Sequence, residues 1–248
     1  MPEGPSIIIL KENIARFKGK KIRKAGGNAT IDIKSLKGQK VLDILSWGKQ
    51  FFLCMNDVTI RIHLLLFGSY SLDEQTKPDK SLRLMLDFSN GKLFFYTCSV
   101  RVLDKNIDSL YDWEADVLSD RWKPAKARKK LKITPDIMVC DALLDQHIFS
   151  GVGNIIKNEV LYRIRLHPET KLGNLPAAKL SELIREARTY SFDFLGWKRD
   201  FILRKHWLAY SKKICRRCNI AFKKKPCGVT GRRTFYCDNC QILYRDPL

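Results

Sequence analysis

Apolar positions recur at helical spacing close to the start of the chain. The residues of this run are Ile7, Leu10, Ile14 and Phe17. Side chains three and four positions apart share one face of a helix, so this spacing predicts an amphipathic helix over 6–17 that ends before Gly19. Pro5 fits the first turn of this helix, because proline has no N–H group and the first N–H groups of a helix are unpaired.

From about residue 21 to residue 104, short apolar and β-branched stretches replace the helical pattern. They read KVLDIL, KQFFLCM, VTIRIHLLLF, LRLMLDF and KLFFYTC, and such stretches are typical of strands. Asn90-Gly91 separates the last two, and an Asn-Gly pair between apolar runs is the strongest short signal of a hairpin. Antiparallel strands behind an N-terminal helix predict a β-sandwich domain, to which we assign residues 1–120.

Helical spacing returns between about residue 137 and residue 206. The segments that carry it are Met138–Leu144, Ile155–Ile164 and Ala177–Phe194. Gly151-Val152-Gly153 separates the first two, which predicts two helices joined by a glycine-rich turn, as in a helix-turn-helix arrangement. We assign 134–211 to this helical domain. The basic, proline-interrupted segment RWKPAKARKKLK before it predicts a linker over 121–133, either close to phosphate groups or simply solvated.

Basic residues far outnumber acidic ones, with 46 Lys and Arg against 26 Asp and Glu, a formal net charge of +20. So large an excess indicates a polyanionic partner, which could be DNA, RNA or an anionic membrane. No apolar run approaches the ~20 residues of a membrane span, and no signal-peptide pattern or basic amphipathic anchor is apparent. We therefore expect a cytoplasmic, monomeric protein that binds nucleic acid and no membrane.

Four of the eight cysteines form two Cys-X-X-Cys pairs separated by 18 residues, Cys215 with Cys218 and Cys237 with Cys240. Each pair presents two thiolates to one ion, and two pairs complete the tetrahedral shell of a structural Zn²⁺. A disulfide or redox role is the alternative for one such pair, but two pairs at this spacing favour one zinc ion. Residues 212–248 should then form a zinc finger whose folding is coupled to metal binding, with Cys227 outside the ligand set.

Three segments resemble the formamidopyrimidine-DNA glycosylase / endonuclease VIII family of base-excision repair enzymes, and most closely its endonuclease VIII branch. They are MPEGP at the start of the chain, DQHIFSGVGNIIKNEVLYRIRLHP at Asp145–Pro168 and GRRTFYCDNCQ at Gly231–Gln241. Their order along the whole chain makes the resemblance specific. It implies an α+β multidomain protein that binds damaged DNA, built of a β-sandwich with an N-terminal helix, a helix-two-turn-helix domain and a zinc-finger hairpin.

The resemblance also implies a covalent mechanism at the N-terminus. Met1 would be removed, and the amine of Pro2 would attack C1′ of the damaged nucleotide, releasing the base and leading through a Schiff base to β,δ-elimination. An α-amine has a pKa of about 8, so part of it is neutral near pH 7. Glu3 would serve as general acid and base at the sugar. Lys49 would contact a phosphate near the lesion, although its position alone also fits an ordinary surface lysine.

Contacts with DNA follow from the same resemblance. Asn154 and Arg232 match residues that bind phosphates, and Asn154 also fits a helix N-cap. A base inside a duplex must be flipped out before it can react, and the hole that it leaves must be filled. Leu65, Leu66 and Phe67 match the loop that fills the hole; the alternative is that they are strand residues of the core.

One departure from the family pattern concerns Ser6, where the family usually has an acidic residue. Its loss could reduce opening of the sugar ring or strand cleavage. The wording of the opening segment and the compact stretch after Gly196 favour oxidised pyrimidines as substrates. The alternatives are a glycosylase for 8-oxoguanine and formamidopyrimidine, a catalytically silent relative that recognises DNA damage or structure, and a zinc-ribbon RNA or transcription factor.

Overall fold

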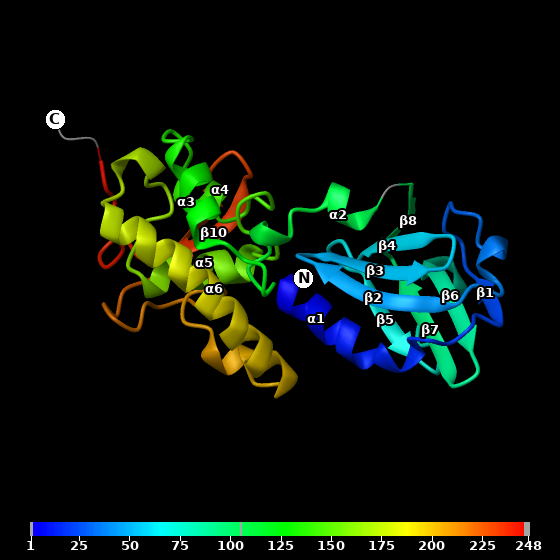
Figure 1. Ribbon diagram of the computed structural model, residues 1–248. Coiled ribbons are helices and arrows are strands. Elements are labelled where there is room, and N and C mark those ends of the chain that lie inside the picture. The colour runs from blue at the N-terminus through cyan, green and yellow to red at the C-terminus, as the bar shows by residue number, and fades with distance from the viewer. Residues whose placement is uncertain (1, 105, 246–248) are drawn as a thin grey trace. The chain divides into compact units, whose positions relative to one another are not determined.

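The computed structural model describes residues 2–104 and 106–245, and the chain divides into two compact units, Met1–Tyr111 and Asp112–Leu248 (Figure 1). Each unit has its own cluster of buried apolar side chains. The division falls between Tyr111 and Asp112, ahead of the predicted boundary at residue 120.

The first unit is a sandwich of two four-stranded sheets, with strand orders β1-β6-β7-β5 and β2-β3-β4-β8. All of its strand pairs are antiparallel. The strands are β1 (Lys24–Gly26), β2 (Val41–Trp47), β3 (Gln50–Met55), β4 (Thr59–His63), β5 (Ser69–Leu72), β6 (Leu82–Phe88), β7 (Gly91–Tyr96) and β8 (Ser99–Leu103). The predicted hairpin is confirmed, since Phe88 pairs with Gly91 and Ser89-Asn90 joins β6 to β7. A short helix α2 (Ile107–Leu110) ends the unit.

The predicted N-terminal helix is also confirmed. Helix α1 (Gly4–Asn13) is followed by one 3₁₀ turn, η1 (Ala15–Phe17). The four apolar residues that predicted it are fully buried and belong to the core of the sandwich. Helix α1 packs on β2 and β3, and this packing fixes the position of the first residues of the chain in the first unit.

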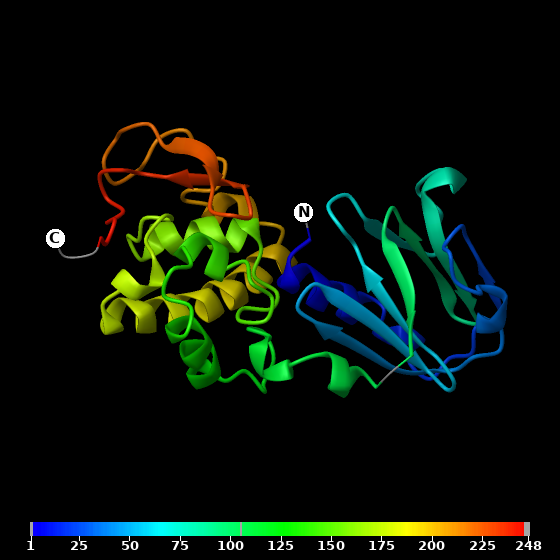
Figure 2. The same ribbon diagram turned by 90° about the horizontal axis from the view of Figure 1, so that it is seen from above.

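The second unit combines helices with one β-hairpin. Its helices are α3 (Pro124–Lys132), α4 (Val139–Ala142), α5 (Asn154–Arg163) and α6 (Ala177–Arg199), with short 3₁₀ helices η4 (Trp113–Ala115), η5 (Leu172–Asn174) and η6 (Leu203–His206). The hairpin pairs β9 (Lys223–Cys227) with β10 (Arg232–Tyr236), and β10 packs against α5. Figure 2 shows this hairpin above the helices of its unit. None of the helices in the described residues is long and apolar enough to cross a membrane.

The basic segment predicted as a linker over 121–133 forms helix α3 instead. Ala127 and Leu131 are buried in the core of the second unit, and α3 packs against α6. Two apolar side chains one turn apart therefore anchor a helix whose other positions are mostly lysine and arginine. The α+β fold class is confirmed, with a β-sandwich, a helical domain and a C-terminal hairpin. A domain boundary between residues 211 and 212 stays a prediction.

Candidate active site and nucleic-acid contacts

The start of the chain lies against the first turn of α1. Glu3 is the N-cap of this helix, and its carbonyl oxygen accepts a hydrogen bond of 2.8 Å from the Ser6 N–H group. Glu3 is 0% exposed, whereas Pro2 and Ser6 are half-buried. The extended backbone of Glu3, with φ −120° and ψ 173°, marks the point where the chain enters the helix. A carboxylic acid is thus buried one residue from Pro2, which suits proton exchange with a reacting group.

Lys49 lies in the tight turn between β2 and β3. Trp47 pairs with Gln50, so Gly48 and Lys49 form a two-residue hairpin loop. Gly48 has φ +52°, a conformation that glycine adopts without strain at the first position of such a loop. The loop leaves the Lys49 side chain half-buried rather than fully exposed.

His63, on the strand next to this turn, was not predicted from the sequence as a site residue. It pairs with Gln50 across β3 and β4. Burial, followed by the positive charges of Arg61 and Lys49, holds the pKa of His63 below its usual value. Lys49 precedes Gln50, the residue that pairs with His63, so the two residues lie at the same end of neighbouring strands of one sheet. Only the strand register reveals their proximity, because 14 positions separate them in the sequence.

The three predicted wedge residues lie in a tight loop after β4. Leu64 is buried, and its carbonyl oxygen accepts a 2.7 Å hydrogen bond from the Gly68 N–H group. A Cβ atom on Gly68 would lie 2.1 Å from that oxygen, so only glycine fits there. The loop exposes Leu65 by 50%, Leu66 by 46% and Phe67 by 76%. The alternative that they are core strand residues is therefore wrong, while insertion into DNA stays a prediction.

His63 also holds this loop, because its Nδ1 atom accepts a 3.1 Å hydrogen bond from the Leu65 N–H group. Leu65 has φ +51°, which is unusual for a side chain branched beyond Cβ. The histidine thus connects the edge that carries Lys49 to the exposed apolar loop within the first unit.

Asn154 is the first residue of α5, and it is buried. Gly153, not Asn154, is the N-cap, so the predicted capping role is wrong. The Asn154 Nδ2 atom donates a 2.9 Å hydrogen bond to the carbonyl oxygen of Arg233, and its Oδ1 atom has no hydrogen-bond partner in the described part of the chain. Its phosphate contact stays a prediction. The structure shows that Asn154 ties the helix to the hairpin.

Two further residues of α5 hold the same hairpin strand, and no sequence motif pointed to them. The Nζ atom of Lys157 donates a 2.7 Å hydrogen bond to Thr234 Oγ1, and Asn158 Oδ1 accepts one of 2.7 Å from the Phe235 N–H group. Burial lowers the pKa of the Lys157 ammonium to about 8. Arg232, half-buried at the start of β10, is thereby followed by three successive residues that α5 holds, two through the backbone and Thr234 through its hydroxyl group.

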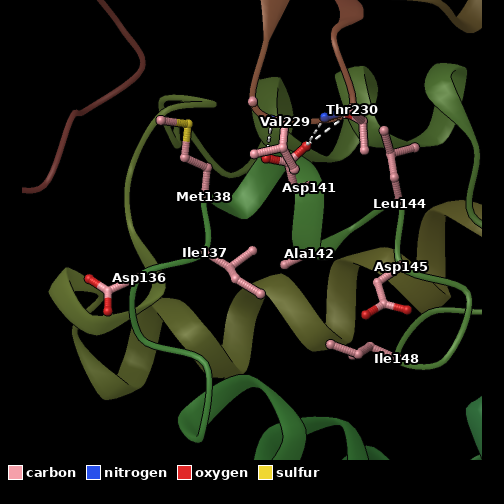
Figure 3. Close-up of a pocket in the computed structure, with 11 residues that line it drawn as sticks. Asp136, Ile137, Met138, Asp141, Ala142, Leu144, Asp145, Ile148, Val229 and Thr230 are labelled. Atoms are coloured by element: carbon pink, nitrogen blue, oxygen red, sulfur yellow. Dashed lines mark hydrogen bonds between the residues drawn. The ribbon is translucent and has the colours of Figure 1, made fainter.

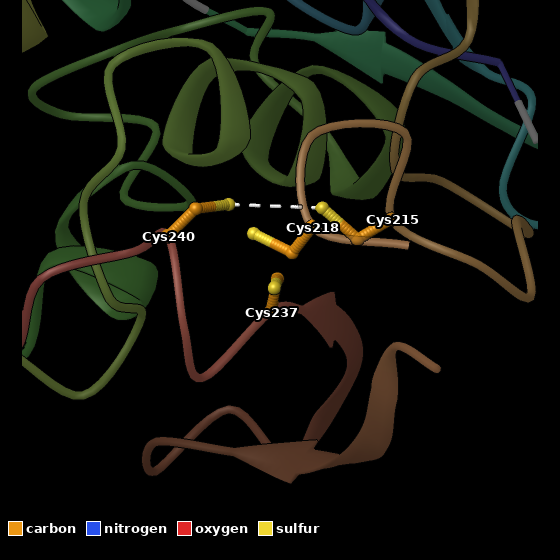
Figure 4. Close-up of side chains that lie close together, drawn as sticks. All are labelled: Cys215, Cys218, Cys237 and Cys240. Carbon is orange, nitrogen blue, oxygen red and sulfur yellow. Dashed lines mark hydrogen bonds between the residues drawn. The ribbon is translucent and has the colours of Figure 1, made fainter. Parts of the chain in front are cut away.

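The four paired cysteines form one cluster at the other end of the hairpin, where their side chains converge (Figure 4). All four Sγ atoms lie within 4.8 Å of one another, and those of Cys215 and Cys240 are 3.7 Å apart. A tetrahedral ion with metal–sulfur bonds of about 2.3 Å requires sulfur atoms roughly 3.8 Å apart, so these residues fit a metal ion. Cys227 is buried and lies outside the cluster, as predicted.

Comparisons with protein families match both units. Residues 1–102 match the formamidopyrimidine-DNA glycosylase N-terminal domain, and residues 114–190 match the formamidopyrimidine-DNA glycosylase H2TH domain. The chain is 30% identical over 202 residues to Endonuclease 8-like 3 of Mus musculus, covering 78% of this chain and 33% of that protein. It is 26% identical over 256 residues to DNA-(apurinic or apyrimidinic site) lyase Nei2 of Mycolicibacterium smegmatis, covering 97% and 99%.

The chain thus spans about a third of the length of several curated relatives that it matches, which are endonuclease 8-like 3 proteins. Among solved structures, a viral DNA glycosylase superposes with a TM-score of 0.84 at 22% identity, covering 97% of this chain and 100% of that one. The Lactococcus lactis formamidopyrimidine-DNA glycosylase, non-covalently bound to DNA containing an AP site, gives 0.83 at 22%, covering 96% and 99%. At this identity these likenesses show the fold.

Proposed function

Because this chain belongs to the formamidopyrimidine-DNA glycosylase / endonuclease VIII family, we propose that it is a base-excision repair enzyme, a bifunctional DNA glycosylase and AP lyase. The observation that carries the proposal is the pairing of Pro2 with a fully buried Glu3 at the start of α1. A buried carboxylic acid beside a chain-terminal amine supplies a nucleophile and a proton carrier at one point.

The proposed reaction begins with the neutral amine of Pro2 after Met1 has been removed. Its nitrogen attacks C1′ of the damaged nucleotide, the glycosidic bond breaks, and the base leaves with its bonding electrons. The departing base takes the proton from the Pro2 nitrogen, and Glu3 delivers a proton to the ring oxygen of the sugar. The nitrogen lone pair then opens the ring, and an iminium ion joins Pro2 to C1′. The iminium makes the C2′ hydrogen acidic: loss of this proton expels the 3′ phosphate, and loss of the C4′ proton then expels the 5′ phosphate.

DNA is the proposed partner, and the net charge of +20 supports it. In the first unit Lys49 would contact a phosphate, while Leu65, Leu66 and Phe67 would fill the space of the flipped nucleotide. In the second unit Asn154 and Arg232 would contact phosphates. Oxidised pyrimidines are the proposed substrates, and we propose a monomer that acts in the cytoplasm with the DNA.

We further propose that the metal of the cysteine cluster is one Zn²⁺ ion. Four thiolates fill a tetrahedral shell and leave no position for a substrate or a water molecule, so the ion would serve folding and not catalysis. Cys215, Cys218, Cys237 and Cys240 would hold it at the base of the hairpin that carries Arg232.

Borohydride trapping tests the central step. Protein whose mass shows the loss of Met1 is mixed with duplex DNA containing one abasic site and is reduced with sodium borohydride. We expect a covalent adduct. A matched protein with an N-terminal extension, in which Pro2 stays in a peptide bond, should form none although its side chains are unchanged; Pro2→Gly should trap far less.

Absence of an adduct with correctly processed protein would contradict the proposal and favour a catalytically silent DNA-binding relative. Ser6 is the residue that would explain such an outcome, and Ser6→Glu should then restore some trapping. Incision of duplexes that each carry one oxidised pyrimidine or purine decides the substrate class. Faster incision at purine lesions would contradict the preference for pyrimidines.

A further inference from the structure

The tip of the β9–β10 hairpin has little apolar support. It consists of Gly228-Val229-Thr230-Gly231, and the Val229 side chain is 95% exposed. A cavity of about 650 Å³ lies beside the tip (Figure 3), lined mainly by apolar side chains. These are Ile137, Met138, Ala142, Leu144 and Ile148. Apolar contact therefore does not determine where the tip lies.

Hydrogen bonds to one carboxylate hold the tip instead. Asp141, a buried residue of α4, accepts bonds of 2.9 Å from the Val229 N–H group, 3.1 Å from the Thr230 N–H group and 2.8 Å from the Thr230 hydroxyl group. Gly228 makes this approach possible, because a Cβ atom there would lie 2.1 Å from Asp141 Oδ2. Its φ of +67° also favours glycine.

Arg232 lies between this clamp and the contacts of α5. On one side Thr230 is bound to Asp141, and on the other side the carbonyl oxygen of Arg233 accepts a hydrogen bond from Asn154. Two buried side chains from different helices therefore fix the backbone on both sides of the arginine. Few rotations of the hairpin are compatible with both contacts, so the direction of the Arg232 side chain is limited.

We propose that Asp141 is a positioning residue for DNA binding, which acts by orienting Arg232 toward a phosphate. This rests on the proposed phosphate contact of Arg232. Simple electrostatics predicts the opposite effect for removal of Asp141: a protein that loses a negative charge should bind a polyanion more tightly. The sign of the change therefore separates positioning from charge.

The experiment measures the affinity of the full chain for abasic-site duplex DNA at several salt concentrations, by fluorescence anisotropy. We expect Asp141→Ala to weaken binding about tenfold, and the slope of log K against log salt to fall by about 0.9, the value of one phosphate contact. Asp136→Ala is the matched control. Asp136 lines the same cavity, but its carboxylate is exposed and pairs with Lys171 instead of with the tip. It should leave binding unchanged or make it slightly tighter.

A double-mutant comparison shows whether Asp141 acts through Arg232. If it does, Asp141→Ala should have little effect in the Arg232→Ala background. Additive effects, or tighter binding by Asp141→Ala with an unchanged slope, would overturn the proposal. If Arg232→Ala binds DNA as tightly as the unchanged protein, the proposed phosphate contact of Arg232 is wrong. This outcome is distinct from a failure of the positioning role of Asp141.

Metal content and folding are followed in the same samples through the absorption of Co²⁺ bound to the four cysteines. If Asp141→Ala loses this spectrum, Gly228→Ala provides the second variant, because its added methyl group would separate the tip from the Asp141 carboxylate while the charge of Asp141 is kept. Weaker binding by Gly228→Ala with the Co²⁺ spectrum intact supports positioning. Unchanged binding with the tip displaced would contradict it.

Discussion

At the scale of single residues, two buried charged groups on α5 are stabilised in different ways. Both Lys157 and Glu159 are 0% exposed. The Glu159 carboxylate accepts hydrogen bonds of 2.8–3.0 Å from the N–H groups of Leu208, Ala209 and Tyr210, and burial nevertheless raises its pKa. Lys157 has the Thr234 hydroxyl group as its acceptor. The lysine is therefore the less compensated of the two charges.

Replacing Lys157 by Met should stabilise the protein, and more so at lower pH. Burial lowers its pKa to about 8, while an unfolded chain keeps a lysine near its usual value of about 10.4. Below pH 8 both states carry the proton and the cost of burying the charge is complete. Between about pH 8 and 10.4 only the unfolded chain holds the proton, so this cost falls as the pH rises.

Denaturant unfolding at pH 7.5, 8.5 and 9.5 measures this difference. At pH 7.5 the free energy of unfolding of Lys157→Met should be higher than that of the unchanged protein by roughly 2–3 kcal/mol. This difference should become smaller as the pH rises. The exposed Lys129→Met variant is the control and should show no such trend. A gap that stays constant with pH would mean that Lys157 keeps an ordinary pKa.

Phe67 should matter for the reaction and not for stability. With 76% of its side chain exposed, Phe67→Ala should change the free energy of unfolding by less than about 0.5 kcal/mol. We expect incision of duplex DNA to fall about tenfold while incision of single-stranded DNA changes little, because only a duplex leaves a hole to fill. Leu42→Ala, which removes another exposed apolar side chain from the first unit, is the control. Equal losses on both substrates would argue against a wedge.

At the scale of elements, local patterns predicted the structure wherever one face of an element was apolar. Helix α1 and the β6–β7 hairpin follow directly from spacing and from Asn90-Gly91. Helix α3 was missed because only two of its side chains, Ala127 and Leu131, are buried. Their burial stabilises the helix only through packing against α6, which is distant in the sequence. Strong local patterns are enough to predict an element, whereas a basic helix such as α3 can be predicted only when its packing partner is known.

The candidate site shows the same division. The spacing of the four cysteines predicted their cluster, since the geometry of the ion is encoded in two short turns. The contact of Asn154 with Arg233 spans 79 positions, and that of Asp141 with Thr230 spans 89. The periodicity of apolar residues does not predict hydrogen bonds between polar residues so far apart in the sequence. The hydrogen bonds between the helices and the hairpin could therefore be identified only from the structure.

Removal of the metal should unfold the hairpin selectively. Treatment with a chelator, or Cys237→Ser, would take away the proposed ion, which would join the two ends of the hairpin, so β9 and β10 should lose protection in hydrogen exchange. The amides of the β-sandwich should keep their protection because they belong to a separate core. Cys227→Ala, at a buried cysteine outside the cluster, should retain the metal. Simultaneous loss of protection in both units would contradict this expectation.

At the scale of the whole molecule, the proposed functions are divided between two units that each have a core. Met1–Tyr111 carries Pro2, Glu3 and the exposed apolar loop after β4, while Asp112–Leu248 carries the cysteine cluster and Arg232. The proposed chemistry and much of the proposed phosphate binding thus lie in different units. Catalysis on DNA should then require both.

Expressing the units separately tests this division. We expect residues 112–248 to bind DNA with a shallower salt dependence than the whole chain, because fewer phosphates are neutralised. Residues 1–111 alone, with Met1 removed, should give little borohydride adduct at a DNA concentration that saturates the full protein. Efficient trapping by residues 1–111 would show that the second unit is dispensable for engagement of the lesion.

The loop between Leu64 and Gly68 has a consequence for the heat of binding. Its three exposed apolar side chains are hydrated in the free protein. If they enter the duplex, this hydration is lost, and the heat capacity of the system falls. Calorimetry at several temperatures should therefore give a more negative heat-capacity change with damaged than with intact DNA. Insertion of the loop at a lesion would then be measurable as a steeper temperature dependence of the binding enthalpy.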